Sequence, residues 1–214
     1  MVTAFSYNQI KDWLESSFQE YKVKDKLIGV IFAQPTPFIK SEVTDSIEYF
    51  HFRSEHNIAI FWAGYEQAEY NHPNKVWEIE NVPWRFNVQK FNELRKAFEA
   101  ETKWKYSGET DLLLFQAGLN SSKSIEFDYS DAIIINLEKA KNENAISSVR
   151  GLFEIIFRIS DHLHKDNLPM ELSAKLIVDT GKKAVFPLLV SFLPERFRKD
   201  VTKVYTFCTE NISK

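Results

Sequence analysis

Residues 49–56 form the densest group of side chains in this sequence that could do chemistry. The segment is Tyr-Phe-His-Phe-Arg-Ser-Glu-His and contributes His51, Arg53 and His56. An imidazole base, a hydroxyl, a carboxylate and a guanidinium are the groups that acid–base or nucleophilic catalysis uses. Arg53 could also clamp a carboxylate or a phosphate with its planar fork of donors. The alternative is a solvated turn with one structural histidine, since no nucleophile-elbow pattern surrounds the serine.

A second group, Glu109 and Asp111, precedes the apolar run 112–115. Carboxylates that enter a buried strand resemble the metal-binding part of a nuclease core, where they hold a hard cation through oxygen. Such a site needs a second carboxylate and a lysine on the next strand. Glu126 and Asp128 are there, but no Glu-x-Lys follows them. The alternative is a turn in which Glu109 and Asp111 bind backbone amides.

A third group is the aromatic segment 76–86, with Trp77, Trp84 and Arg85. Prolines at positions 73 and 83 predict an irregular chain from 67 to 85. Large aromatic side chains on a surface loop are typical of contact surfaces and lids. We therefore predict a partner- or ligand-binding role for Trp77, Trp84, Arg85 and Arg53. The two tryptophans could equally fasten this long connection onto the sheet.

Neither a metal nor a cofactor is predicted. His162 and His164 are two residues apart, and side chains at that spacing on a helix do not face each other. The one cysteine, Cys208, excludes an intramolecular disulfide and an all-cysteine metal site. The absence of a Cys-x-x-Cys motif argues against a redox role.

The elements that must position these residues follow from hydrophobic patterns. The run 58–64 is apolar throughout, which predicts a strand covered on both faces, and runs 27–33 and 111–115 are similar. Residues 125–129 alternate like an edge strand. Helices are predicted after Ser6 and after Asn87, both of which are good N-cap residues. Residues 131–137 are ambiguous, and the charged residues that follow them favour a helix.

The order of these elements predicts an α/β or α+β fold, a three-layer structure in which about 4–5 strands are flanked by helices. The alternation is comparable to that of a thioredoxin-like sheet, which ends in an antiparallel pair. Composition changes near residue 144, and from there we predict an all-helical C-terminal part. We divide the chain into a sheet domain, 1–143, and a helical region, 144–214, which packs on it as one compact unit.

Composition limits the environment and the partners. A net charge of -3 makes nucleic acid an unlikely partner, since it argues against a surface that follows a phosphate backbone. The longest uncharged stretch, 184–194, is too short to span a bilayer, and the first residues lack the basic and apolar regions of a secretory signal. We therefore expect a soluble, cytoplasmic protein with no membrane partner.

The sequence leads to two main functional hypotheses. The first is a soluble bacterial-type binding or regulatory protein that acts through an aromatic-rich surface loop on a protein partner or a second copy of itself. A toxin-immunity or defence role would suit it. The rival is a hydrolase- or nuclease-like enzyme whose polar pocket combines His51, Arg53 and His56 with Glu109 and Asp111. That pocket requires the two strand entrances to meet, which parallel neighbouring strands would allow.

Overall fold

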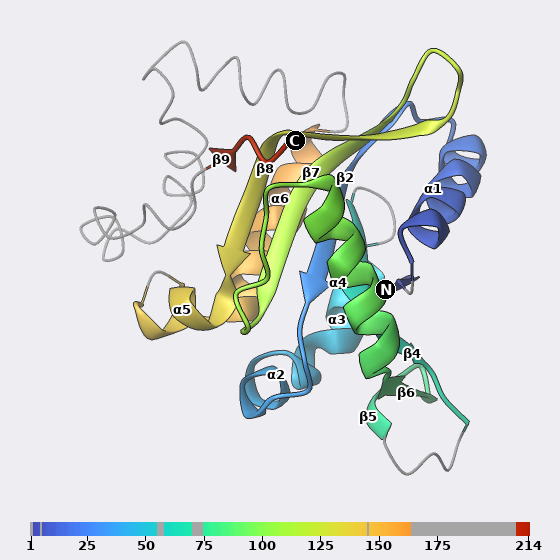
Figure 1. The fold of residues 1–214 in the computed structure, drawn as a ribbon. Coiled ribbons are helices and arrows are strands. Elements are labelled where there is room, and N and C mark those ends of the chain that lie inside the picture. Colours follow the sequence, from blue (N-terminus) through green and yellow to red (C-terminus); the bar gives the residue numbers. More distant parts are fainter. Residues whose placement is uncertain (1, 5, 55–57, 70–74, 145, 164–208) are drawn as a thin grey trace.

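The computed structural model describes residues 2–4, 6–54, 58–69, 75–144, 146–163 and 209–214. Helices and strands alternate in the first half of the chain, and strands dominate the centre (Figure 1). In chain order the elements are β1 (Val2–Ala4), α1 (Tyr7–Tyr21), β2 (Asp25–Phe32), α2 (Pro37–Glu42), the 3-10 turn η1 (Thr44–Ser46), α3 (Ile47–Arg53), β3 (Ile58–Ala63), β4 (Tyr65–Gln67), β5 (Lys75–Ile79), β6 (Val82–Phe86), α4 (Val88–Glu101), β7 (Asp111–Leu119), β8 (Ile125–Asn136), α5 (Leu137–Asn142), α6 (Val149–Leu163) and β9 (Thr209–Glu210).

The main sheet has the strand order β1-β3-β2-β7-β8-β9. Strands β1, β3 and β2 are parallel, whereas β7, β8 and β9 each run antiparallel to the preceding strand. The mixed sheet with flanking helices confirms the predicted fold class. The parallel strands followed by the antiparallel pair β7–β8 agree with the thioredoxin-like ordering.

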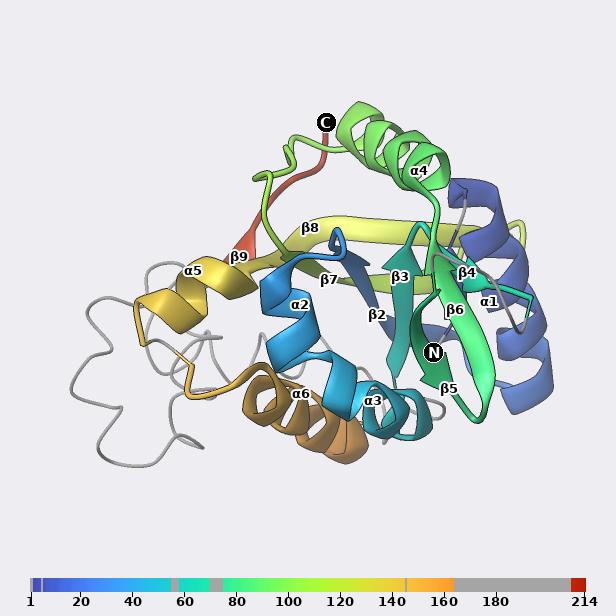
Figure 2. The ribbon, with the colours of Figure 1, turned by 90° about the horizontal axis from the view of Figure 1, so that it is seen from below.

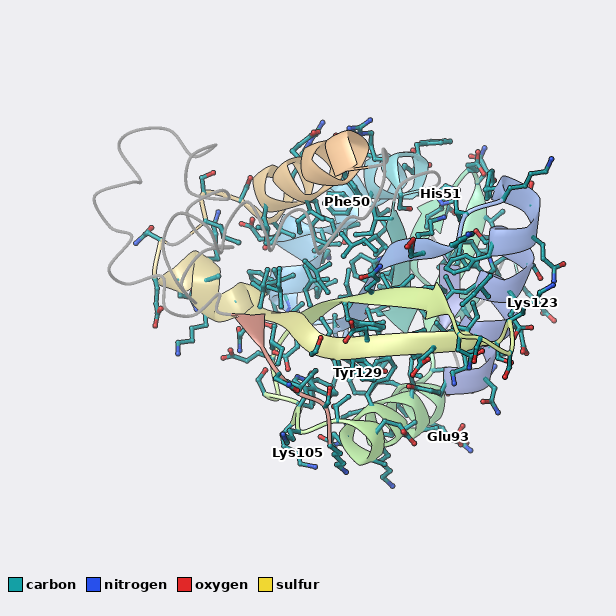
Figure 3. All side chains as sticks on the ribbon, turned by 90° about the horizontal axis from the view of Figure 1, so that it is seen from above. Phe50, His51, Glu93, Lys105, Lys123 and Tyr129 are labelled. Carbon is teal, nitrogen blue, oxygen red and sulfur yellow. The ribbon has the colours of Figure 1, made fainter. Side chains whose placement is uncertain are left out.

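Helices cover both faces of the main sheet (Figure 2). On one face, α1 and α4 bury Ile10, Leu14, Phe91 and Phe98 against the sheet. On the other face, α2, α3 and α6 enclose a second core. Figure 3 shows this division at two labelled residues, because Phe50 lies on the α6 side and Tyr129 on the α4 side.

Strand β3 confirms the prediction of an interior strand, since all six of its residues are buried between β1 and β2. The two predicted helix starts are also confirmed. The side chain of Ser6 accepts a hydrogen bond from the Gln9 N–H and begins α1, and Asn87 caps Gln89 and Lys90 at the start of α4.

The predicted helix over 131–137 is wrong. These residues continue β8 to Asn136, and the β-branched run there pairs with β7 through Leu112–Ile135, Leu113–Ile134 and Leu114–Ile133. Asn136 then caps α5, which holds the charged residues that had favoured a helix. Pairing with β7 therefore outweighs the local preference.

Strands β4, β5 and β6 form a second, antiparallel sheet with the strand order β4-β6-β5. The prediction of an irregular segment is therefore wrong for 75–85. Glu80 and Asn81 both have positive φ, 51° and 64°, as a two-residue hairpin turn requires. The small sheet is inserted between β3 and α4, and its aromatic face joins the core that α3 and α6 enclose.

In the C-terminal part predicted to be all-helical, α6 is a helix, and its apolar side packs into the core through Phe153 and Phe157. The helices predicted within 164–208 lie outside the described residues. The division at residue 144 remains a prediction. Within the described part of the chain, no helix is both long enough and apolar enough to cross a membrane.

Candidate functional site

The turn formed by residues 105–110, here called the Ser107 turn, lies where the central strand β2 ends. Asp111 begins β7 directly after the turn and pairs with Phe32, the last residue of β2. In open α/β sheets, ligands bind outside the carboxyl ends of the parallel strands. The position of the turn therefore makes it the first candidate for a functional site.

The Asp111 carboxylate anchors the turn from below. The side chain is buried, and it accepts hydrogen bonds from the Ser107 N–H to Oδ2 at 2.9 Å and from the Ser107 hydroxyl to Oδ1 at 2.7 Å. Burial raises the pKa of Asp111, as does the charge of Glu109. The bonds from Ser107 and the nearby Trp104 indole act in the opposite direction. This arrangement matches the alternative in which Asp111 binds a backbone amide.

The Ser107 hydroxyl is fully used within the turn. While it donates to Asp111, it accepts from the Glu109 N–H at 3.1 Å and from Asn136 Nδ2 at 3.2 Å. A hydroxyl has one hydrogen and two lone pairs, so no lone pair remains to attack a substrate. The hydrogen-bonded pair of Ser107 and Asp111 therefore stabilises the turn and is not an activated nucleophile.

Further bonds fix the rest of the turn. Asn136 Nδ2 also donates to Glu109 Oε2 at 2.8 Å, and the Thr110 hydroxyl donates to Glu138 Oε1 at 2.9 Å. On the other side, the Tyr106 N–H donates to Glu99 Oε1 at 3.1 Å. Ser107, Gly108 and Glu109 are nevertheless exposed. The turn is thus a rigid segment on the surface, held by β7, β8, α4 and α5.

Tyr106 connects the turn to the end of β2. Burial and the charges of Asp111 and Glu138 raise the pKa of Tyr106 to about 12, while Gln34 and Arg95 lower it. Gln34 follows β2 and is exposed. Residues 34–37 and the Ser107 turn therefore present polar and backbone groups at the same edge of the sheet.

The predicted site around His51 and Arg53 lies elsewhere. His51 and Arg53 are in the last turn of α3, where His51 Nε2 is 3.9 Å from Glu80 Oε2 and the Arg53 guanidinium lies 5.8 Å from the centre of the Phe157 ring. His51 and Lys105 lie on opposite sides of the sheet (Figure 3). His56 lies outside the described residues, as do residues 55 and 57.

Among the described residues, the strand register keeps His51 and Arg53 apart from Glu109 and Asp111. β7 runs antiparallel to β2, and β2 runs parallel to β3. The start of β3 is therefore level with Leu27, and Asp111 is level with Phe32, five residues further along β2. That separation is about 16 Å along the strands. The expectation of strand entrances at one edge is wrong, because the strands concerned are not parallel neighbours.

The register also separates the carboxylates of the proposed nuclease-like core. Asp128 pairs with Gln116, whereas Asn136 lies opposite Asp111. Asp128 and Glu126 are therefore near the far end of β7. In the described part of the chain, no three His, Cys, Asp or Glu side chains come together in a group that could hold a metal ion.

Trp77 and Trp84 are buried, with exposed fractions of 3% and 4%. They pair across β5 and β6 and face the core, so the prediction of an aromatic-rich surface loop is wrong. The structure supports the alternative in which these tryptophans fasten the connection onto the sheet. The strand alternation explains why, because Glu78 points outward between Trp77 and the buried Ile79.

Arg85 belongs to an ion cluster at the start of α4. Its Nη2 and the Lys90 Nζ each lie 2.7 Å from the Glu66 carboxylate, and Asn87 Nδ2 donates to the same group at 3.2 Å. Burial alone would raise the pKa of Glu66. The bonds from Lys90 and Asn87 and the charges of Lys90 and Arg85 outweigh that effect, so the pKa lies below its ordinary value. The cluster ties the small sheet to α4.

The sequence contains signals for some of what was missed. The hairpin β5–β6 could have been recognised from Glu80-Asn81 between two alternating segments, since Asn tolerates positive φ. Asn136, which bridges Ser107 and Glu109, had no local signal. Its role depends on the pairing of β8 with β7, which places it opposite Asp111.

Comparison with known proteins gives no relative for this chain. No family model matches it, and no curated protein or solved structure is significantly similar.

Proposed function

We propose that this protein is a binding or regulatory protein whose contact surface is the Ser107 turn together with residues 34–37. The observation that carries the proposal is the rigidity of an exposed turn. Binding orders flexible segments at a cost in conformational entropy, and a turn that is already ordered avoids most of that cost. Hydrogen bonds from the turn to the Asp111 and Glu99 carboxylates, and from the Asn136 amide to the turn, hold it in one conformation while leaving Gly108 open to solvent.

The groups at this edge favour binding over catalysis. The Ser107 hydroxyl has no lone pair left, and both oxygens of Asp111 accept hydrogen bonds. No observation favours the hydrolase- or nuclease-like alternative, because among the described residues His51 and Arg53 are not combined with Glu109 and Asp111 at one edge.

A photo-crosslinking experiment tests the proposal. The photoreactive residue benzoylphenylalanine would replace Gln34 at the proposed surface. As the control it would replace Ser122, which is exposed in the turn between β7 and β8 at the opposite edge of the sheet. We expect a discrete protein adduct from position 34 and none from position 122. An adduct of twice the mass of the chain would identify the partner as a second copy.

A matched pair of substitutions distinguishes specific binding at this surface from non-specific crosslinking. Ser107→Ala removes the hydroxyl that links Asp111, Glu109 and Asn136, so the turn should loosen and the adduct should decrease several-fold. Ser122→Ala removes an exposed hydroxyl at the other edge and should leave the adduct unchanged. Equal adducts from positions 34 and 122, or an adduct that Ser107→Ala does not reduce, would contradict the proposal.

A further inference from the structure

Residues 209–214, here called the strap, run from the outer edge of β8 to the end of α4 (Figure 2). The first two residues of the strap form β9 and pair with β8. The strap then crosses to the chain that follows α4, where Ser213 lies opposite Thr102 as a single antiparallel pair. One short segment therefore links the main sheet to the end of α4.

Ile212 is the buried residue of the strap. Its exposed fraction is 2%, and its side chain belongs to the core on the α1 and α4 face of the main sheet. Its N–H donates to the Tyr129 carbonyl at 3.1 Å, and its carbonyl accepts from the Lys103 N–H at 2.8 Å. Ile212 therefore fixes the strap between β8 and residues 102–104, here called the stem.

Lys214 acts on the end of α4. Its Nζ donates to the Glu99 carbonyl at 3.2 Å and to the Ala100 carbonyl. Lys105 makes a longer bond, 3.4 Å, to the same Glu99 carbonyl. The last carbonyls of a helix carry partial negative charge and attract cations, yet α4 has no basic residue in its own last turn. The strap therefore supplies a cation that the helix itself does not contain.

Glu99 connects the strap directly to the Ser107 turn. While its backbone carbonyl accepts from Lys214, its carboxylate Oε1 accepts from the Tyr106 N–H at 3.1 Å. Arg95 holds the same carboxylate at 3.3 Å from the preceding turn of the helix. When Lys214 leaves, the last turn of α4 loses a bond, and the Glu99 carboxylate becomes less restricted. The seated strap thus stabilises the contact through which α4 holds the turn.

The stem provides a second connection. The hydroxyl of Thr102, opposite the strap, accepts a hydrogen bond from the Trp104 N–H at 3.2 Å. The Trp104 indole lies beside the Asp111 carboxylate, and that carboxylate accepts both hydrogen bonds from Ser107. A contiguous path of hydrogen-bonded and packed groups therefore leads from the strap to the anchor of the turn. Paths of this kind carry energetic coupling between two sites.

The strap is held by fewer contacts than the turn. Within 211–214, Ile212 alone is buried, and Asn211 and Lys214 are exposed. Pairing with β8 involves only the two residues of β9 in the described part of the chain. Short segments with few buried side chains and exposed hydrogen bonds open at the lowest free energy. Release of the strap therefore requires no unfolding of the main sheet.

We propose that the strap is a latch that regulates the Ser107 turn. The seated strap keeps the turn rigid and able to bind its partner, and the released strap loosens the turn and weakens binding. Because such coupling is reciprocal, a partner bound to the turn also holds the strap in place. The effect on binding rests on the proposed function, whereas the mechanical link between strap and turn does not.

Amide hydrogen exchange of the full-length chain measures the link without any partner. The N–H groups of Tyr106, Ser107 and Glu109 are hydrogen-bonded within the turn, so their exchange rates report its rigidity. The N–H groups of Ser122 and Ser124 are hydrogen-bonded in the β7–β8 turn and serve as reference amides away from the strap.

Two isoleucine substitutions form a matched pair. Ile212→Ala removes the buried side chain of the strap and should accelerate exchange of the three turn amides at least about tenfold, with the reference amides unchanged. Ile125 is buried in the same core at the other end of β8, opposite Leu119. Ile125→Ala removes the same atoms from that core and should not accelerate the turn amides selectively. Lys214→Gln should accelerate the Tyr106 amide several-fold, because it removes the cation beside Glu99.

The latch is refuted if Ile212→Ala accelerates the turn amides no more than Ile125→Ala does, or accelerates the reference amides equally. The crosslink from position 34 then tests the regulation itself. Ile212→Ala should reduce that adduct several-fold, and an undiminished adduct from a loosened turn would also refute the proposal. If the turn amides accelerate as expected but the unsubstituted chain gives no adduct from position 34, the latch stands and the proposed function fails.

Discussion

Gly64 provides the sharpest test of how the small sheet meets α4. This residue joins β3 to β4 with a φ of +78°, and its carbonyl accepts a hydrogen bond from the Asn87 N–H. A Cβ atom at position 64 would lie 2.6 Å from Phe91 Cβ, 2.9 Å from the Asn87 oxygen and 3.0 Å from Phe91 Cα. These atoms belong to the start of α4 and cannot rotate away. Gly64→Ala must therefore displace the helix.

Gly108→Ala is the matched control. Gly108 also has a positive φ, +92°, but an added Cβ there would meet no atom within 4 Å. Its cost is only that of the left-handed backbone, about 1–2 kcal/mol. Gly64→Ala adds an overpacking cost of about 1–3 kcal/mol to the same backbone cost. We expect the free energy of unfolding to fall by about 2–5 kcal/mol for Gly64→Ala.

Urea denaturation followed by tryptophan fluorescence measures both variants, with the slope of each transition as a check on two-state unfolding. The difference between the two substitutions isolates the steric contribution, because both share the backbone penalty. If Gly64→Ala lowers the free energy of unfolding no more than Gly108→Ala does, the inference that α4 packs closely against the β3–β4 junction is wrong.

Three further predictions concern the polar clusters. Burial raises the pKa of Asp111 above its ordinary 3.8, so the native state holds this proton more tightly than the unfolded state; stability should fall as pH rises from about 4 through the folded pKa, and Asp111→Asn should remove that decline in a pH series of urea midpoints. Glu66 has a lowered pKa, so its contribution is complete above its ordinary 4.5 and is lost as pH falls through the folded value; Glu66→Gln should flatten this acid limb, and an unchanged limb would show that the ion cluster does not contribute. Asn136→Ala removes the bridge to Ser107 and Glu109, so amide hydrogen exchange should accelerate in residues 107–109 but not in the β7–β8 turn, and uniform acceleration would refute a local role.

The sequence predicted elements whose signals are local. The continuous apolar run of β3 requires cover on both faces, and Ser6 and Asn87 begin helices with their own side chains. These features need no knowledge of the rest of the chain. The prediction of a helix at residues 131–136 was wrong because the deciding signal is not local. Their strand conformation depends on pairing with Leu112, Leu113 and Leu114.

The candidate site was only partly accessible to sequence reasoning. For Asp111, the alternative of a turn in which its carboxylate binds a backbone amide describes the contacts. The predicted pocket that combined Asp111 with His51 depended on the directions of the strands, which residue types do not encode. Trp77 and Trp84 were misplaced because aromatic side chains serve both cores and surfaces, and only the strand alternation of the hairpin decides between them.

The central position of β2 has a consequence for how the chain is made. Ile28 pairs with Ala59 on one side and with Phe115 on the other, so neither neighbour of this apolar strand is close to it in the chain. During synthesis, β2 emerges long before β7 does, and one of its edges stays open for most of that interval. Open apolar edges promote association between nascent chains. Slow translation between β3 and β7 is therefore expected to lower the yield of native protein, and binding by a holdase chaperone to raise it.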